Sequence, residues 1–212
     1  MRRRLPFSLV LIVLVGCLSG CSEEAPRDVV TTSSVSDAPG DVVVGGLGED
    51  WDAVAAAPSN MITDILETTV DHGSAVITVE VVFEDLRPQQ YLDLTAYLTT
   101  DATGSALPTQ ASALTYQGES SIDVYRAGTT RCDGADAGTL AIDFDTDTVT
   151  MTVPRSCLDA PRWIEAEVRA ATMRYDALPD DPRANAVWED DAYLPALEAP
   201  MDGGTSGRLY HP

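Results

Sequence analysis

Residues 74–84 read SAVITVEVVFE, and this stretch decides the fold class. Apolar and polar side chains alternate along it with a period of two, which is the pattern of a β-strand with one buried and one solvated face. One face holds Ile77, Val79, Val81 and Phe83, and the other holds Thr78, Glu80, Val82 and Glu84. The stretch therefore predicts a half-buried strand of an antiparallel sheet, since such sheets commonly have one face in water.

The same alternation recurs on both sides of this strand. Residues 62–70 predict a partner strand, joined to it by a hairpin turn at residues 71–73. Further strands are expected at 91–98, 113–117, 121–125 and 164–170, and the clearest hairpin pairs 140–144 with 149–153 across a turn at 145–147. No long amphipathic helix is predicted. The sequence indicates an all-β fold, an antiparallel β-sandwich of about seven or eight strands that is immunoglobulin-like or jelly-roll-like.

The N-terminus has the features of an export signal. Three arginines (Arg2–Arg4) precede an apolar run, Leu5–Val15, that is too short to span a bilayer as a mature helix. Two lipobox patterns follow, one ending at Cys17 and the other at Cys21. We predict cleavage and lipidation at Cys21, because residues 22–24 (Ser-Glu-Glu) are polar at once. Lipidation at Cys17, or an ordinary secretory signal with incidental cysteines, is the alternative.

Residues 1–20 are thus a predicted lipoprotein signal peptide, and Cys21 would carry palmitate or similar acyl chains. Each buried CH₂ of such a chain contributes about 0.8 kcal/mol, so two or three chains hold a protein firmly to a bilayer. This predicts a lipoprotein of the cell envelope, bound to the cell membrane through its lipid anchor and exposed on the extracytoplasmic face.

Composition divides the rest of the chain into three parts. Residues 21–40 are rich in Ser, Thr, Asp and Pro and predict a flexible tether. Residues 41–176 hold the predicted strands and form the β-sandwich domain. Residues 177–212 predict an irregular, Pro-rich and acidic tail, in which Trp188, Tyr193 and Leu194 could pack along the sandwich. Residues 201–212 are expected to be disordered.

The chain is strongly acidic. It has 34 Asp and Glu against 13 Arg and no Lys, which gives a net charge of −21, and loss of the three signal-peptide arginines takes this to −24. Binding to nucleic acid needs Lys and Arg to displace counterions, so no nucleic acid partner is expected. The charge fits solubility, a bound cation or a basic partner.

Two cysteines remain after removal of the signal, Cys132 and Cys157, one on each side of the predicted hairpin at 140–153. Exported proteins meet oxidising conditions, so we expect a disulfide between them that ties the open end of the hairpin. A closed loop of this size stabilises a fold by about 3 kcal/mol in the chain-entropy model. Two buried free thiols are the alternative.

Three short motifs carry a resemblance to a known group of proteins. They are residues 37–41 (DAPGD), residues 62–73 (ITDILETTVDHG) leading to Asp85-Leu86, and residues 154–164 (PRSCLDAPRWI). Over roughly residues 37–175 the chain resembles secreted or lipid-anchored actinobacterial β-sandwich domains with a D..GD opening and a PRSCL..PRW closing motif. The resemblance supports the sandwich and the Cys132–Cys157 bridge, and it implies no activity. At residues 100–104 the chain departs from this group, because Asp101 is the one carboxylate there and a calcium site needs several.

Motifs of well-known enzymes are absent from the sequence. No G-x-S-x-G, H-E-x-x-H, Walker or G-x-G-x-x-G pattern occurs. The two histidines are His72, expected in a hairpin turn, and His211, in the tail, so neither is assigned a catalytic role. No catalytic residue, metal ligand or cofactor is predicted.

Two kinds of ligand site remain as alternatives. Acidic clusters at 143–147 and at 180–181 with 189–191 could bind Ca²⁺, although solvated charge is the simpler interpretation. Three tryptophans (Trp51, Trp163 and Trp188) could form a sugar-stacking platform, although Trp163 is expected to pack at the edge of the sandwich.

We therefore expect a membrane-anchored lipoprotein that carries a non-catalytic binding or scaffolding module, with an envelope protein or a glycan as its partner. A carbohydrate- or calcium-binding sandwich is the first alternative. A hydrolase is the second, and it would need a deep pocket with converging polar groups.

Overall fold

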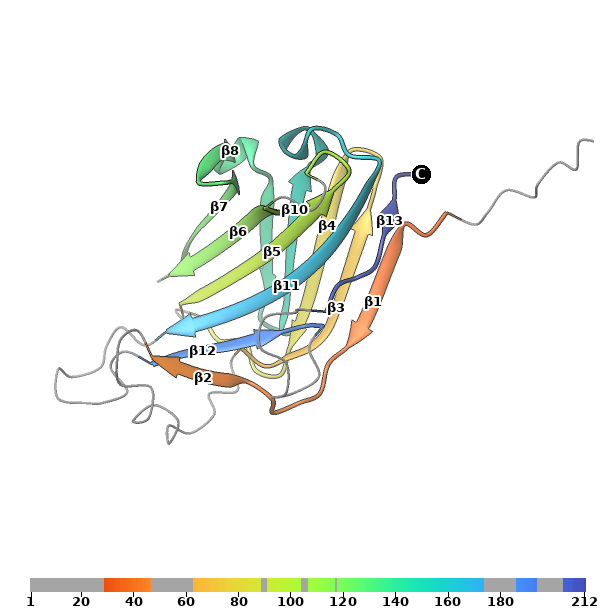
Figure 1. Cartoon of the computed structure of the whole chain (residues 1–212). Coiled ribbons are helices and arrows are strands. Elements are labelled where there is room, and N and C mark those ends of the chain that lie inside the picture. Colours follow the sequence, from red (N-terminus) through yellow and green to blue (C-terminus); the bar gives the residue numbers. More distant parts are fainter. Residues whose placement is uncertain are drawn as a thin grey trace, which may run out of the picture.

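The computed structural model describes residues 29–46, 63–88, 91–103, 107–116, 118–173, 186–193 and 204–212. These residues form two antiparallel sheets that pack face to face (Figure 1). The all-β sandwich predicted from the sequence is therefore confirmed. No helix in these ranges is long and apolar enough to cross a membrane.

The first sheet has five strands in the order β1-β3-β4-β10-β9. They are β1 (Thr32–Ser36), β3 (Ile65–His72), β4 (Val76–Phe83), β9 (Thr139–Asp143) and β10 (Thr148–Pro154). The second sheet has eight strands, in the order β2-β12-β11-β5-β6-β7-β8, with β13 paired to β11. They are β2 (Val43–Gly46), β5 (Leu92–Thr100), β6 (Thr109–Tyr116), β7 (Glu119–Arg126), β8 (Thr129–Asp133), β11 (Trp163–Met173), β12 (Ala186–Asp191) and β13 (Leu209–Tyr210). Two short 3-10 helices, η2 (Gly134–Asp136) and η3 (Arg155–Leu158), follow β8 and β10.

The predicted alternation sets the inner face of each sheet. On β4 the buried residues are the four apolar ones expected, Ile77, Val79, Val81 and Phe83. On β5 of the other sheet they are Leu92, Leu94, Ala96 and Leu98. Burial of these two faces against each other removes apolar surface from water, which stabilises the sandwich by about 25 cal/mol per Å².

Both predicted hairpins are present, and one turn differs from the prediction. Val149 on β10 lies opposite Ile142 on β9, and Val70 on β3 lies opposite Val79 on β4. However, β3 continues to His72, which is fully buried, and the turn comprises residues 73–75. The expectation that His72 lies in the turn is wrong, because the period of two that points Val70 inward carries on to His72.

The N-terminal boundary of the domain also differs from the prediction. Residues 32–36, expected in the flexible tether, form β1 and pair with β3, with Thr32 opposite Asp71 and Ser36 opposite Glu67. The segment TSSVS lacks apolar alternation, so its strand depends on bonds to its neighbour. The Thr32 hydroxyl donates to the Asp71 carboxylate at 2.5 Å, and the Ser34 hydroxyl donates to Glu67 at 2.9 Å.

The C-terminal segment, expected to be an irregular tail ending in disorder, completes the eight-stranded sheet. β12 pairs with β11 and β2, and β13 pairs with the start of β11. Beside them, the Ser206 N–H donates to the Ala166 carbonyl at 2.8 Å, and Leu209 is only 1% exposed. Tyr193 packs against the core as expected, while Leu194 lies outside the described residues.

Candidate functional site

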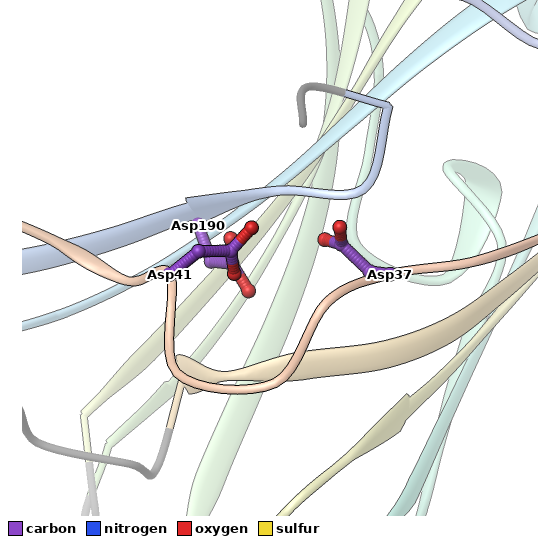
Figure 2. A group of neighbouring side chains, drawn as sticks. All are labelled: Asp37, Asp41 and Asp190. Carbon is purple, nitrogen blue, oxygen red and sulfur yellow. The ribbon is translucent and has the colours of Figure 1, made fainter. Parts of the chain in front are cut away.

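Three aspartates converge where the β1–β2 loop meets β12. Asp37 and Asp41 lie on the loop, as the two acidic residues of the D..GD motif, and Asp190 lies on β12 (Figure 2). One carboxylate oxygen from each residue lies within 4.8 Å of the other two. We call these three residues the acidic cluster.

Hydrogen bonds to carboxylates hold the D..GD loop in place. Asp64, which immediately precedes β3, accepts the Gly40 N–H at 2.6 Å. Gly40 has a φ of 87°, in the region that favours glycine, so the motif needs a glycine at this turn. Asp190 accepts the Ile65 N–H at 2.6 Å. The loop and β12 are therefore both fastened to the first residues of β3.

Burial makes these carboxyl groups hard to ionise. Burial, with a smaller contribution from neighbouring carboxylates, raises the pKa of Asp190 to about 7 and that of Asp37 to about 6. Burial also raises the pKa of Asp64 and that of Asp191. Arg169 lies 3.1 Å from the Asp191 carboxylate and offsets part of that negative charge. At neutral pH the group therefore holds protons that exposed aspartates would have lost.

The acidic cluster can hold either protons or a hard cation. Several converging carboxylate oxygens are the ligands that Ca²⁺ and Mg²⁺ take in proteins. A cation at this point would displace protons from these carboxyl groups and offset the repulsion between the carboxylates. The residues that would hold it are Asp37, Asp41 and Asp190.

The acidic clusters predicted from the sequence are arranged differently. In the β9–β10 turn, Asp147 accepts the Leu86 N–H at 2.8 Å and Asp143 accepts the Asp145 N–H at 2.9 Å, so two of these carboxylates stabilise turns. Of the second predicted cluster, residues 180–181 lie outside the described residues, and Asp190 belongs to the acidic cluster. Within the described ranges, the acidic cluster is the one group of three carboxylates spaced for a metal ion.

The tryptophans within the described residues do not share a platform. Trp163 begins β11 and Trp188 lies opposite Thr172 near its end, and these nine positions correspond to about 30 Å of strand. Trp188 is buried, whereas the Trp163 ring lies under the Arg208 guanidinium at 4.3 Å. Trp163 pairs with Tyr210 of β13 at the start of β11, a strand with neighbours on both sides, and Trp51 lies outside the described residues.

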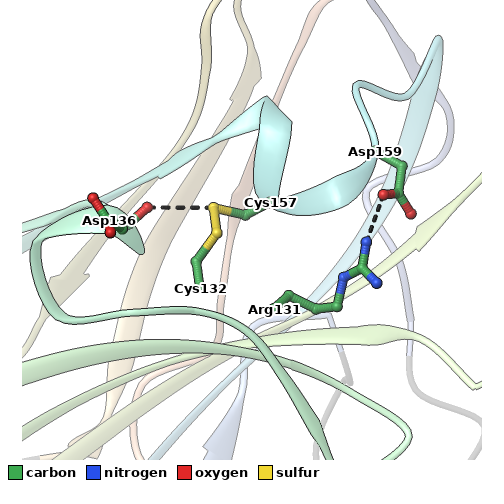
Figure 3. Close-up of a disulfide and its surroundings, with 5 residues drawn as sticks. All are labelled: Arg131, Cys132, Asp136, Cys157 and Asp159. Atoms are coloured by element: carbon green, nitrogen blue, oxygen red, sulfur yellow. Dashed lines mark hydrogen bonds and ion pairs between the residues drawn. A yellow bond between two sulfur atoms is a disulfide. The ribbon is translucent and has the colours of Figure 1, made fainter.

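The predicted disulfide between Cys132 and Cys157 is present (Figure 3), with a Cα–Cα distance of 5.8 Å. Cys132 lies on β8, at the edge of the eight-stranded sheet, and Cys157 lies in η3, directly after β10 of the five-stranded sheet. The bond therefore cross-links the two sheets as well as the ends of the hairpin. Beside it, Arg131 pairs with Asp159 at 2.5 Å.

A buried histidine and an arginine connect several segments at the same end of the molecule. Arg155, in the PRSCL..PRW motif, donates to the carbonyls of Ser74 and Pro161, and its Nε–H donates to Nε2 of His72 at 3.2 Å. His72 Nδ1 in turn donates to the Leu209 carbonyl at 3.0 Å. Because arginine can only donate, the His72 ring is neutral with its proton on Nδ1. Burial and the Arg155 charge lower the pKa of His72 accordingly.

Two other residues singled out in the sequence have structural partners. The His211 ring, expected in a disordered tail, packs edge-on against the His72 ring with 5.9 Å between ring centres. Asp101 accepts the backbone N–H of Arg162 at 2.9 Å and its Nε–H at 2.8 Å. The carboxylate at residues 100–104 therefore accepts hydrogen bonds from an arginine of the PRSCL..PRW motif.

Comparison with known proteins gives no family assignment. No protein-family model matches the chain, and no curated protein is significantly similar to it in sequence. The predicted lipidation site Cys21, with its alternative Cys17, lies outside the described residues. Function is therefore inferred from the residues and their geometry.

Proposed function

We propose that the protein is a cell-envelope lipoprotein, anchored through acyl chains on Cys21, that presents a non-catalytic binding or scaffolding module outside the cell membrane. The observation that carries the proposal is a disulfide-bonded sandwich downstream of a lipobox. Disulfides persist in oxidising compartments, which agrees with export. Membership of the lipid-anchored actinobacterial group that the chain resembles is part of the same proposal.

Two geometric features favour binding over catalysis. Both ring nitrogens of His72 are engaged, so this residue cannot take a proton from a nucleophile. The carboxylates of the acidic cluster converge on one point, whereas the two carboxyl groups of a glycosidase flank a sugar at separations of about 5 to 10 Å. His72 therefore lacks the free ring nitrogen of a catalytic triad, and the acidic cluster lacks the spacing of a glycosidase pair.

Metabolic labelling with palmitate tests the anchor. Wild-type protein and the matched Cys17→Ser variant should incorporate the label and sediment with membranes, whereas Cys21→Ser should do neither. Label that persists in Cys21→Ser and disappears in Cys17→Ser would move the anchor to the earlier lipobox. Absence of label from all three proteins would contradict the lipoprotein proposal.

Affinity capture tests the binding role. The mature chain without its lipidated cysteine (residues 22–212), oxidised and immobilised, is exposed to envelope extract in calcium and again in EDTA. A specific protein retained in both buffers is the result expected of a scaffold. A column of reduced and unfolded chain serves as the control. If the folded chain retains no protein or glycan that the control column does not also retain, the binding role is contradicted.

A calcium-binding sandwich is the second candidate, favoured by the convergence of Asp37, Asp41 and Asp190. Titration calorimetry with CaCl₂ should show one site in the mature chain and a raised melting temperature. Asp37→Asn should weaken both effects, because the variant removes one charged ligand. The control variant Asp145→Asn, at an exposed turn, should leave both unchanged. No heat and no thermal shift in the wild type would exclude this candidate.

A further inference from the structure

The outer face of the eight-stranded sheet presents a row of aromatic and amide side chains. Tyr97 on β5 lies opposite Gln110 on β6, and Gln110 lies opposite Tyr125 on β7. All three alternate with buried residues and so project from the outer face, where Gln110 is exposed and the two tyrosines are half-buried. These strands run side by side in Figure 1. We call Tyr97, Gln110 and Tyr125 the tyrosine row.

The spacing of the row is set by the sheet. Neighbouring strands lie about 4.8 Å apart, so the backbones of the two tyrosines, one strand either side of Gln110, are separated by about 10 Å. This is close to the length of one disaccharide unit in an extended glycan. Aromatic rings combine an apolar face with a polar hydroxyl, which suits the C–H faces and hydroxyl groups of sugars. The amide between them can both donate and accept hydrogen bonds.

A pocket lies at the Tyr125 end of the row. Its volume is about 290 Å³, and it is lined by Leu107, Pro108, Gln110, Tyr125, Ala127 and Gly128. The volume lies near the lower end of the range for small-ligand pockets and would accommodate a single sugar unit. Four of its six lining residues are Leu, Pro, Ala and Gly, and Gln110 and Tyr125 are the two with polar side-chain groups. Ala127 and Gly128 belong to the tight turn between β7 and β8 and have positive φ.

A second row of polar groups runs beside the tyrosine row. Along it Arg169, Thr95, Ser112 and Asp123 lie opposite one another on β11, β5, β6 and β7. The hydroxyls of Thr95 and Ser112 both donate to Asp93 at 2.9 Å, so their orientation is fixed before any ligand arrives. Such preorganised groups bind a polyhydroxyl ligand at a smaller entropic cost.

Arg169 connects the two rows. Its guanidinium lies 5.5 Å from the centre of the Tyr97 ring and is held by Glu167 and Asp191. The Arg169 side chain is still 40% exposed, so it retains donors for a ligand hydroxyl. Because its charge is already offset by two carboxylates, the face offers no net attraction to a polyanion.

The charge of the whole chain narrows the class of ligand. A net charge of −21, or −24 without the signal arginines, repels polyanions and leaves neutral or cationic partners. The face supplies stacking rings, hydroxyls, an amide and a small pocket. These groups match a neutral sugar chain. A peptide that binds by strand addition would need an unpaired strand edge, whereas β5, β6 and β7 are each paired on both sides.

We propose that the tyrosine row and its pocket form a binding site for a neutral envelope glycan, with one sugar unit in the pocket and the next two crossing Gln110 toward Tyr97. The inference rests on the proposed function, since it names the ligand class of the binding module.

Calorimetry with defined oligosaccharides tests the site. The mature, oxidised chain is titrated with the neutral probes cellohexaose, chitohexaose, maltohexaose and mannohexaose. At least one should bind, and Tyr125→Ala and Gln110→Ala should each weaken binding about tenfold or more, as the loss of a central anchor does. Tyr125→Phe should retain most of the affinity because it keeps the ring. Phe144→Ala removes an aromatic residue that is 41% exposed after β9, on the other sheet, and should change nothing.

Each contrary outcome overturns the inference. Absence of binding to every probe excludes a neutral glycan site, and binding that survives Tyr125→Ala and Gln110→Ala places any glycan site elsewhere. Melting temperatures of the variants show whether a loss of binding is a loss of fold, and Tyr125→Phe supplies the folded reference. Palmitate labelling and capture of an envelope protein are independent of these variants. The proposal of a lipid-anchored binding module can therefore hold even if the glycan site is excluded.

Discussion

The two ends of strand β3 are fastened in opposite ways. At its start, carboxylates accept backbone N–H groups, as Asp190 does from Ile65 and Asp64 does from Gly40. At its finish, the guanidinium of Arg155 donates to backbone carbonyls and to His72. We call these the acidic end and the arginine end; eight residues of strand, about 25 Å, separate them.

The difference between the ends is one of charge balance. At the arginine end one cation meets neutral acceptors, a disulfide lies nearby, and each feature stabilises the fold. At the acidic end the carboxylates also satisfy the backbone, but they repel one another and resist ionisation. The comparison indicates that the arginine end serves stability. At the acidic end, repulsion between buried carboxylates destabilises the folded state, and binding of a proton or a cation reduces this repulsion.

Removal of the disulfide should have the largest effect at the arginine end. The bond closes a sequence separation of 25 residues, so the double variant Cys132→Ser/Cys157→Ser should lose about 3 to 4 kcal/mol in free energy of unfolding. Urea denaturation measures this, and dithiothreitol should destabilise the wild type to the same level. A double variant as stable as the oxidised wild type would show that the two sheets hold each other without the cross-link.

Arg155→Met should come next, at about 2 kcal/mol of destabilisation. The variant keeps much of the side-chain length but leaves the carbonyls of Ser74 and Pro161 and the Nε2 atom of His72 without their donor. Arg87→Met is the matched control, because Arg87 is exposed and pairs with Asp85 only two residues away. Urea denaturation should detect no change in the control. Equal losses of unfolding free energy in Arg155→Met and Arg87→Met would show that the hydrogen bonds of Arg155 contribute no special stability.

The acidic end should give the protein an unusual loss of stability toward alkaline pH. Raised carboxyl pKa values mean that the folded state binds more protons than the unfolded state. The resulting stability is present below the unfolded pKa of 3.8 and is lost as pH rises through about 6 for Asp37 and about 7 for Asp190. Asp37→Asn should therefore stabilise the protein at pH 8 by about 1 kcal/mol, allowing for solvent screening.

Urea titrations at pH 5 and pH 8, without added divalent cation, measure this effect. Asp145→Asn, at an exposed turn, should keep the wild-type difference between the two pH values. If Asp37→Asn also keeps the wild-type difference in stability between pH 5 and pH 8, the acidic end does not cause that difference.

The smallest effect concerns His72. Burial and the Arg155 charge lower its pKa below 6.5, so the folded state binds fewer protons than the unfolded state. This contribution is therefore lost as pH falls, the opposite direction to that of the acidic end. A ¹³C-resolved NMR titration of the ring should give a midpoint below 6.5 in the wild type and a higher one in Arg155→Met. A midpoint unmoved by Arg155→Met would show that the arginine does not act on this ring.

The fold could be predicted from the sequence wherever a strand carries its own signal. In β4, β5, β9 and β10 every second residue is apolar, and each was predicted near its observed bounds. β1 and β13 carry no such signal. The Ser- and Thr-rich β1 and the two-residue β13 exist because β3 and β11 offer unpaired edges, and a partner distant in the chain is invisible to a local pattern.

Only part of the acidic cluster could be predicted from the sequence. Asp37 and Asp41 stand out in the D..GD motif, but Asp190 lies far along the chain in a run of acidic residues. One local signal could have separated it from its neighbours. Trp188 and Asp190 are two residues apart and so share a face of β12, and that face is buried. An aspartate on the same buried strand face as a tryptophan needs hydrogen-bond donors. For Asp190 these donors are backbone N–H groups.

The pairing of Tyr210 with Val30 has a consequence for how the molecule stands in the envelope. The Tyr210 N–H donates to the Val30 carbonyl at 2.7 Å, so the first described residues and the last strand lie together at the arginine end. Figure 1 shows β13 beside β1. With the proposed anchor at Cys21, the tether would join the molecule at this end. The disulfide would then lie at the end of the molecule that carries the tether, and the acidic cluster would lie at the opposite end of β3.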